Sequence, residues 1–177
     1  MGAAVAAAGR LVVFAAAAAI LSAAAPAPLV DRLAGRYSHR FTNSTIFGET
    51  SLVEDVLEIV PIDRHRGYFR AELNFFNDHM CAISGVARVE GRSLVYRASD
   101  PRLLPGPGCV MRIRQIGARL DLDDGGGTCR STCGARGSYS GGEPEFRLSS
   151  RRRINSSRRI RQTPDFRDAL AEDARSR

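Results

Sequence analysis

The stretch that decides the fold is YFRAELNF, residues 68–75. Apolar side chains recur at every second position from Phe69 to Phe75, and Arg70, Glu72 and Asn74 fill the positions between them. Successive side chains of a β-strand point to opposite faces. The alternation therefore predicts a strand with one buried face and one face in water.

Similar short strands are predicted on both sides of this one. They cover residues 36–41, 53–60, 83–89, 94–97, 109–115, 120–122 and 145–149. The sequence Glu90-Gly91-Arg92 between two of them is typical of a hairpin turn, with glycine where a positive φ is needed. Seven or eight strands joined by short turns predict an all-β fold. We expect a small antiparallel up-and-down, lipocalin-like β-barrel in preference to a sandwich, because a Greek key needs longer connections.

The charge of the chain is unevenly distributed. The net charge is +7, and the chain contains no lysine. Residues 31–148 hold 16 arginines against 15 acidic residues, whereas residues 149–177 hold 9 against 4. We therefore predict a β-barrel domain at 31–150 and an arginine-rich, mostly disordered tail at 151–177. Within the tail, Thr163-Pro164-Asp165 is typical of a helix start and predicts a short helix at 164–174.

The first 25 residues are typical of an export signal. An apolar core follows the single charged residue Arg10, and small residues come after it. Ser22 and Ala24 provide the small side chains that signal peptidase needs, so we expect residues 1–24 to be a signal peptide cleaved after Ala24. The excess of alanine and the absence of lysine indicate a GC-rich bacterial genome. The expected location is therefore the periplasm or the medium.

Four cysteines lie in the predicted mature chain, and an even number in an exported small domain predicts two disulfides. They are Cys81, Cys109, Cys129 and Cys133. Of the three possible connectivities we favour Cys81–Cys109 with Cys129–Cys133, because the second pair would close a short loop and the first would join two strands. A zinc site is the less favoured alternative, since the C-x3-C spacing lacks a matching second pair.

No residue pattern predicts a catalytic, metal or cofactor site. Asp121, Asp123 and Asp124 have the spacing of calcium ligands, but Gly125 stands where a further ligand is needed, so a strand end before a turn is the favoured interpretation. The three histidines are scattered and no nucleophile motif accompanies them. We therefore expect a protein that is not an enzyme and that needs no cofactor.

The most distinctive segment runs from residue 125 to residue 139 and surrounds Cys129 and Cys133 with glycines. A rigid loop at a barrel rim is a common place for binding residues. The candidate binding residues are Arg130, Arg136, Ser138 and Tyr139. The alternative interpretation is a disulfide that only orders a glycine-rich turn.

The arginines of the tail form a second candidate, for contact with an anionic surface. No aromatic side chains alternate with them, so sequence-specific nucleic-acid binding is not expected.

Three blocks carry a family resemblance: LAGRY at 33–37, EDVLEIV at 54–60 and CRSTCGARG at 129–137. They resemble a group of small exported proteobacterial proteins with a C-x3-C-G-A-R-G block, and the resemblance implies no particular chemistry. Gly35-Arg36-Tyr37 is also similar to the Gly-x-Trp opening of lipocalins, which implies an apolar ligand in the barrel mouth. Periplasmic inhibitors of c-type lysozymes are disulfide-bearing barrels of this size, and SYSGG at 138–142 is loosely similar to their serine-glycine loop.

These observations lead to three hypotheses about function. The first is an exported envelope protein that acts as a binding or inhibitor module, with an envelope protein or a lysozyme-type enzyme as its partner. The second is a carrier of a small apolar ligand, of lipocalin type, which would need an interior cavity in place of a solid core of Phe69, Leu73, Phe75, Met111 and Ile113. The third is an enzyme of unrecognised type.

Overall fold

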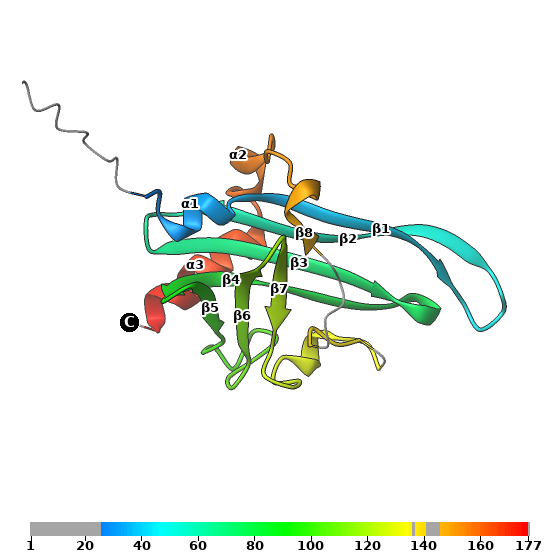
Figure 1. Ribbon diagram of the computed structural model, residues 1–177. Coiled ribbons are helices and arrows are strands. Elements are labelled where there is room, and N and C mark those ends of the chain that lie inside the picture. Colours follow the sequence, from blue (N-terminus) through cyan, green and yellow to red (C-terminus); the bar gives the residue numbers. More distant parts are fainter. Residues whose placement is uncertain (1–25, 136, 141–145, 177) are drawn as a thin grey trace, which may run out of the picture.

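Alternating apolar residues build one antiparallel sheet of eight strands, in the order of the sequence, that is nearly closed into a barrel (Figure 1). The computed structural model describes residues 26–135, 137–140 and 146–176. The strands are β1 (Gly35–Ser44), β2 (Thr50–Pro61), β3 (Arg66–Phe75), β4 (His79–Glu90), β5 (Ser93–Arg97), β6 (Val110–Ile116), β7 (Arg119–Asp123) and β8 (Phe146–Arg147). The helices are α1 (Leu29–Leu33), α2 (Ser157–Ile160) and α3 (Pro164–Arg175), with short 3-10 turns η1 (Phe76–Asp78), η2 (Arg130–Thr132) and η3 (Leu148–Ser150). The predicted up-and-down barrel is confirmed.

The interior of the barrel is filled by the apolar side chains that the alternation placed on one face. Phe69 and Leu73 of β3 meet Met111 and Ile113 of β6 in one buried cluster. Phe75, at the end of β3, is only partly buried against that cluster. The glycine at 85 makes room for a ring: a Cβ there would lie 2.4 Å from the Tyr96 side chain. Side chains from both halves of the sheet therefore form a single core.

The barrel closes through the chain that follows β8, because β8 itself has only two residues. The Arg36 N–H donates to the Arg152 carbonyl at 2.9 Å, and the Arg152 N–H donates back to the Arg36 carbonyl at 2.8 Å. These two hydrogen bonds form an isolated antiparallel bridge between β1 and the end of the barrel domain. Residue 152 thus belongs to the barrel and not to a separate tail.

Because consecutive strands run in opposite directions, the connections between them lie alternately at the two ends of the barrel. We call one the loop end; it holds the connections at 45–49, 76–78, 98–109 and 124–145. The opposite end, which we call the arginine end, holds the short turns at 62–65, 91–92 and 117–118, together with α1 and residues 148–161. In Figure 1 the loop end includes the long β1–β2 hairpin that extends to the right.

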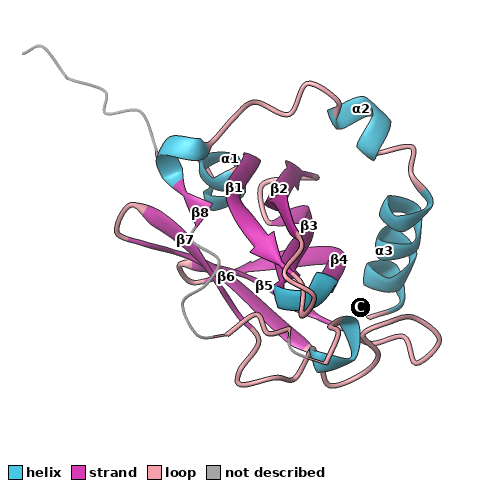
Figure 2. Ribbon diagram, turned by 90° about the vertical axis from the view of Figure 1, so that its right-hand side faces the viewer, coloured by secondary structure: helices cyan, strands magenta, loops and turns pink. Residues whose placement is uncertain are grey.

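The arginine-rich tail packs on the barrel, contrary to the expectation that it is mostly disordered. The helix expected at 164–174 is α3, Pro164–Arg175, capped by the Thr163 hydroxyl, which accepts from the Phe166 N–H. Phe166 and Ala169 cover Tyr68 and other apolar side chains on the outer face of the sheet (Figure 2). The disorder prediction failed because the composition of the tail does not show the apolar outer face that receives it.

The disulfides join Cys81 to Cys133 and Cys109 to Cys129, so the favoured pairing was wrong. The 3-10 turn η2 lies between Cys129 and Cys133, and each of these cysteines bonds to a different strand region. Cys133 pairs with Cys81 of β4 also through the backbone, as an isolated antiparallel bridge. Both disulfides therefore fasten the 124–145 connection to the barrel; neither closes a small loop within it.

Candidate binding surface at the loop end

Exposed apolar side chains gather at the loop end. Seven large hydrophobic side chains are exposed in the described residues: Ile46, Phe47, Leu52, Phe76, Met80, Leu104 and Ile116. The first six lie in the connections of the loop end or on the strands beside them, and Ile116 lies at the arginine end. Phe47 is 84% exposed and Ile46 is 63% exposed, at the tip of the β1–β2 hairpin. Clustered exposed hydrophobic residues are a mark of interaction sites.

The β1–β2 hairpin leaves the barrel at Asp55. Pairing between β2 and β3 ends at Val56 and Glu72, whereas β1 and β2 remain paired up to Ser44 and Thr50. The buried Asp55 carboxylate accepts from the Asn74 N–H at 2.7 Å, and the Asn74 amide donates to the Glu54 carbonyl at 3.0 Å. These hydrogen bonds take the place of further backbone pairing between β2 and β3. They also fix the point at which the two-stranded hairpin separates from the sheet.

Hydrogen bonds also hold the projecting hairpin near its tip. The buried Asn43 side chain donates to the Phe75 carbonyl at 2.8 Å, and the Ile46 N–H donates to Asn77 Oδ1 at 3.2 Å. On the outer face, the Glu54 carboxylate forms ion pairs with Arg36 and Arg40. The tip is therefore supported by the neighbouring η1 turn and does not depend on its own strand pairing alone.

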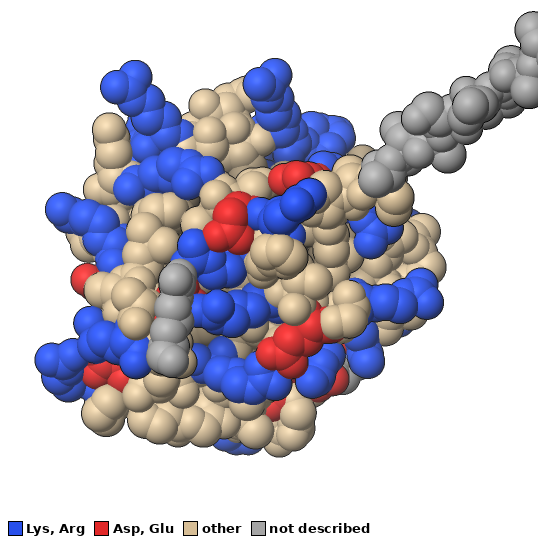
Figure 3. All heavy atoms as spheres, turned by 90° about the vertical axis from the view of Figure 1, so that its left-hand side faces the viewer, with Lys and Arg blue, Asp and Glu red and all other residues tan. Residues whose placement is uncertain are grey.

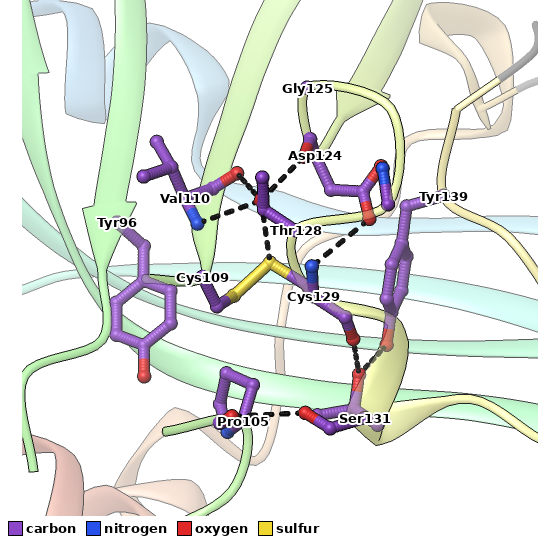
Figure 4. The surroundings of a disulfide bond; sticks show 12 residues. Tyr96, Pro105, Cys109, Val110, Asp124, Gly125, Thr128, Cys129, Ser131 and Tyr139 are labelled. Carbon is purple, nitrogen blue, oxygen red and sulfur yellow. Dashed lines mark hydrogen bonds between the residues drawn. A yellow bond between two sulfur atoms is a disulfide. The ribbon is translucent and has the colours of Figure 1, made fainter. Parts of the chain in front are cut away.

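Asp124 organises the connection beside this hairpin, which we call the rim loop (residues 124–140). Its buried carboxylate accepts from the Gly127 N–H at 3.1 Å, from the Cys129 N–H at 3.2 Å and from the Ser140 hydroxyl at 2.5 Å. Figure 4 shows Asp124 and Thr128 around the Cys109–Cys129 disulfide. One carboxylate thus ties the beginning, middle and end of the rim loop together.

The rim loop packs against the start of β4, directly after the η1 turn that supports the hairpin. The Gly134 N–H donates to the Met80 carbonyl at 2.7 Å. Gly134 also lies against His79, since a Cβ at this position would be 2.9 Å from His79 Nδ1. A groove of ≈ 470 Å³ runs between Ser131–Cys133 of the rim loop, Leu104 and the outer faces of β3 and β4. The loop end therefore combines a convex apolar tip with a shallow groove.

The four predicted binding residues do not form one exposed site. Arg130 and Ser138 are exposed, as expected of contact residues. Tyr139 is only 1% exposed, and its hydroxyl forms a 2.8 Å hydrogen bond with Thr132 Oγ1. Burial raises the pKa of Tyr139 to about 12. Arg136 lies outside the described residues. Tyr139 thus packs inside the rim loop, with its ring covered by the protein.

Sequence reasoning missed the hairpin tip. The signal was present in Thr45-Ile46-Phe47-Gly48, where two large apolar residues stand in a turn. Such residues are normally buried, so their position between two strands at a glycine turn is informative. Without the long β1–β2 pairing, however, the sequence does not show that the turn projects beyond the barrel.

Several acidic and histidine residues of the described chain form local ionic contacts. No group of three or more histidine, cysteine, aspartate or glutamate residues is arranged to hold a metal ion there. Asp121 forms an ion pair with Arg114 at 3.0 Å, and His39 lies 3.9 Å from the Asp55 carboxylate. The ion pair of Asp121 and the end of β7 at Asp123 support the interpretation of the acidic 121–124 segment as a strand end before a turn.

The comparisons with known proteins give no further identification: no protein-family model, curated protein or solved structure matches this chain. Among the described residues, no helix has both the length and the apolar character needed to cross a membrane. The two disulfides indicate an oxidising compartment outside the cytoplasm.

Proposed function

We propose that this protein is an exported binding or inhibitor module, without catalytic activity, that contacts a protein partner through its loop end. The observation that supports the proposal most strongly is the projecting hairpin with Ile46 and Phe47 exposed at its tip. Burial of a fully exposed Phe side chain contributes about 1.5–3 kcal/mol. The complementary partner is a protein with an apolar cleft that can receive the tip.

The rigidity of the loop end supports this proposal. The hairpin is fixed by Asp55 and Asn43, and the rim loop by Asp124 and both disulfides. A surface that is already ordered loses little conformational entropy when it binds. Protease inhibitors and other binding modules commonly have such ordered contact surfaces, and they change shape little on association.

The two other hypotheses receive less support. A lipocalin-type carrier needs an interior cavity, whereas Phe69, Leu73, Met111 and Ile113 pack together inside this barrel. An enzyme needs titratable groups that converge in a cleft. The ionic residues of the outer sheet face pair with one another instead, as Glu58 does with Arg36 and Arg70.

Export and the nature of the partner are parts of the same proposal. The signal-like residues 1–24 lie outside the described residues, and the two disulfides support an oxidising destination such as the periplasm. A lysozyme-type enzyme is a suitable partner class, because its substrate cleft is concave and can receive a rigid projecting hairpin. An envelope protein with an apolar cleft is the alternative partner.

The experiment compares Phe47→Asp with Ile116→Asp in the disulfide-bonded protein. Each variant is tested for inhibition of c-type and other lysozymes, and for binding to envelope proteins identified with the wild-type chain. Phe47→Asp should weaken binding on the order of 100-fold, because a central apolar contact is replaced by a charge that must be desolvated. Ile116→Asp introduces the same charge at the arginine end and should leave the affinity unchanged.

Both substitutions are at exposed positions, so the melting temperature of each variant should stay close to that of the wild type. Equal affinity of Phe47→Asp and the wild type for an identified partner would contradict the proposal. Loss of binding with Ile116→Asp alone would place the contact surface at the opposite end of the barrel.

A further inference from the structure

The arginine end carries a dense group of positive charges. The eleven residues RRRINSSRRIR at 151–161 contain six arginines and no acidic residue. All six arginines are exposed. We call this segment the arginine strap.

The positive charges of the strap are not neutralised by carboxylates of the described chain. Arg151 donates to the Asp31 carbonyl, Arg152 to the Ser149 carbonyl and Arg161 to the Pro61 carbonyl, so their acceptors are backbone oxygens. The other three, Arg153, Arg158 and Arg159, form no ion pair or hydrogen bond through their side chains within the described residues. Six cationic groups held together repel one another, and an anionic partner removes that repulsion.

Two of the four acidic residues that follow the strap point into the protein. Glu172 and Asp173 of α3 are buried. Glu172 accepts from the Ser99 and Asp100 N–H groups, and Asp173 forms ion pairs with Arg66 and Arg88. These two acids therefore anchor α3, whereas Asp165 and Asp168 are exposed on that helix. Within the strap itself no acidic residue offsets the arginines.

The strap is held on the barrel as an ordered surface. Arg152 pairs with Arg36 through two backbone hydrogen bonds, and Ile160 is buried beside α3. Gly35 has φ +150°, and a Cβ there would lie 3.0 Å from Arg151 Cγ and 3.2 Å from the Arg152 carbonyl oxygen. Glycine at this position lets the strap lie directly against β1. The arginines thus project from a supported backbone.

Other turns of the same end add to the positive surface. Arg32 of α1, Arg64 of the β2–β3 turn and Arg92 of the β4–β5 turn are exposed. In Figure 3, which faces this end of the barrel, arginine side chains are spread over the visible surface and outnumber the acidic ones. The positive charge therefore covers a face of the molecule, with the strap as its densest part.

A groove with an apolar floor runs along the strap. Its volume is ≈ 430 Å³, and its lining includes the apolar residues Val60, Pro61 and Ile154 together with the three arginines at 151–153. This juxtaposition suits an amphiphile: phosphate oxygens pair with guanidinium groups, while an apolar portion contacts the floor. No aromatic residue in the strap is available for base stacking, which nucleic-acid surfaces commonly use.

We propose that the arginine end docks the protein onto an anionic bilayer, with the guanidinium groups of residues 151–161 on the phosphodiester headgroups. Juxtamembrane arginines are attracted to the negative potential of such surfaces. Docking in this orientation leaves the loop end directed away from the bilayer. The inference is independent of the identity of the partner at the loop end.

The test measures co-sedimentation of the full disulfide-bonded chain with vesicles that contain phosphatidylglycerol and with vesicles of phosphatidylcholine alone. Binding should occur only to the anionic vesicles and should weaken as salt is added. The double variant Arg158→Gln/Arg159→Gln should bind roughly 30-fold more weakly. The matched control, Arg40→Gln/Arg130→Gln, removes the same charge from exposed positions near the loop end and should bind like the wild type.

Four results would overturn the proposal. The first is equal binding of the wild type to both kinds of vesicle. The second is an equal loss of affinity in the strap variant and the control, which would show only an effect of net charge. The third is displacement from the vesicles by inorganic phosphate beyond that caused by chloride at the same ionic strength, which would indicate a site for a free anion. Tighter binding to a duplex oligonucleotide than to anionic vesicles also contradicts it.

Discussion

At the residue scale, single buried polar groups hold the irregular parts of this protein in place. Asp124 accepts three hydrogen bonds within the rim loop. Where the hairpin leaves the barrel, the Asp55 carboxylate accepts from the Asn74 N–H in place of backbone pairing between β2 and β3. A buried carboxylate is stable only where donors compensate for its desolvation. The sequence shows both residues but not their donors, so calcium binding stays the less favoured alternative to a strand end at Asp124.

Tyr139 gives a pH-dependent prediction. Burial raises its pKa to about 12, a hydrogen bond with Thr132 lowers it in part, and the Asp124 carboxylate raises it further. The unfolded phenol titrates near pH ~10, so the contribution of the neutral phenol to stability is complete below that pH. As the pH rises toward about 12, the unfolded state loses its proton first and stability falls.

The variant Tyr139→Phe should therefore show a shallower loss of unfolding free energy above pH ~10 than the wild type. At neutral pH it should be about 1 kcal/mol less stable, because its hydrogen bond is lost. Urea unfolding at a series of pH values measures both effects. The control Thr132→Val removes the same hydrogen bond and keeps the phenol, so it should keep the full alkaline slope. If Tyr139→Phe had the same alkaline slope as the wild type, the Tyr139 phenol would not be the group responsible for the loss of stability.

At the element scale, the tail shows what local sequence can and cannot predict. The helix at 164–174 could be predicted from Thr163-Pro164-Asp165, since capping chemistry is local. The docking of that helix could not, because it depends on Tyr68, Tyr96 and backbone N–H groups of other elements. The disulfide pairing was wrong for the same reason: Cys81 and Cys133 are neighbours across strands, and spacing along the chain does not show that.

Glu172 should be the main polar anchor of α3. It accepts from the Tyr96 hydroxyl at 3.1 Å and from the N–H groups of Ser99 and Asp100 at 2.8 and 3.1 Å. Glu172→Ala leaves these donors without their acceptor and should cost about 2–4 kcal/mol. Hydrogen exchange in α3 should rise together with this loss. Asp168→Ala on the exposed face of the same helix is the control, and an equal effect of both substitutions would show that Glu172 has no special role.

At the scale of the whole molecule, the up-and-down order separates two surfaces with different properties. Alternate connections lie at alternate ends, so the apolar hairpin tip and the arginine strap are at opposite ends of one barrel. Strand alternation was sufficient to predict the barrel, because periodicity is a local property. The candidate binding residues were chosen from spacing alone, which does not show that Tyr139 is buried or that Ile46 and Phe47 are exposed on a projecting hairpin.

The central claim is that the loop end is the surface by which this protein contacts its protein partner. The most direct measurement places a photo-crosslinking amino acid at position 47, and separately at position 116, in cells that produce the protein in an oxidising compartment. A discrete crosslinked adduct with one partner protein is expected from position 47, and none is expected from position 116. Adducts from position 116 alone, or the same adducts from both positions, would contradict it.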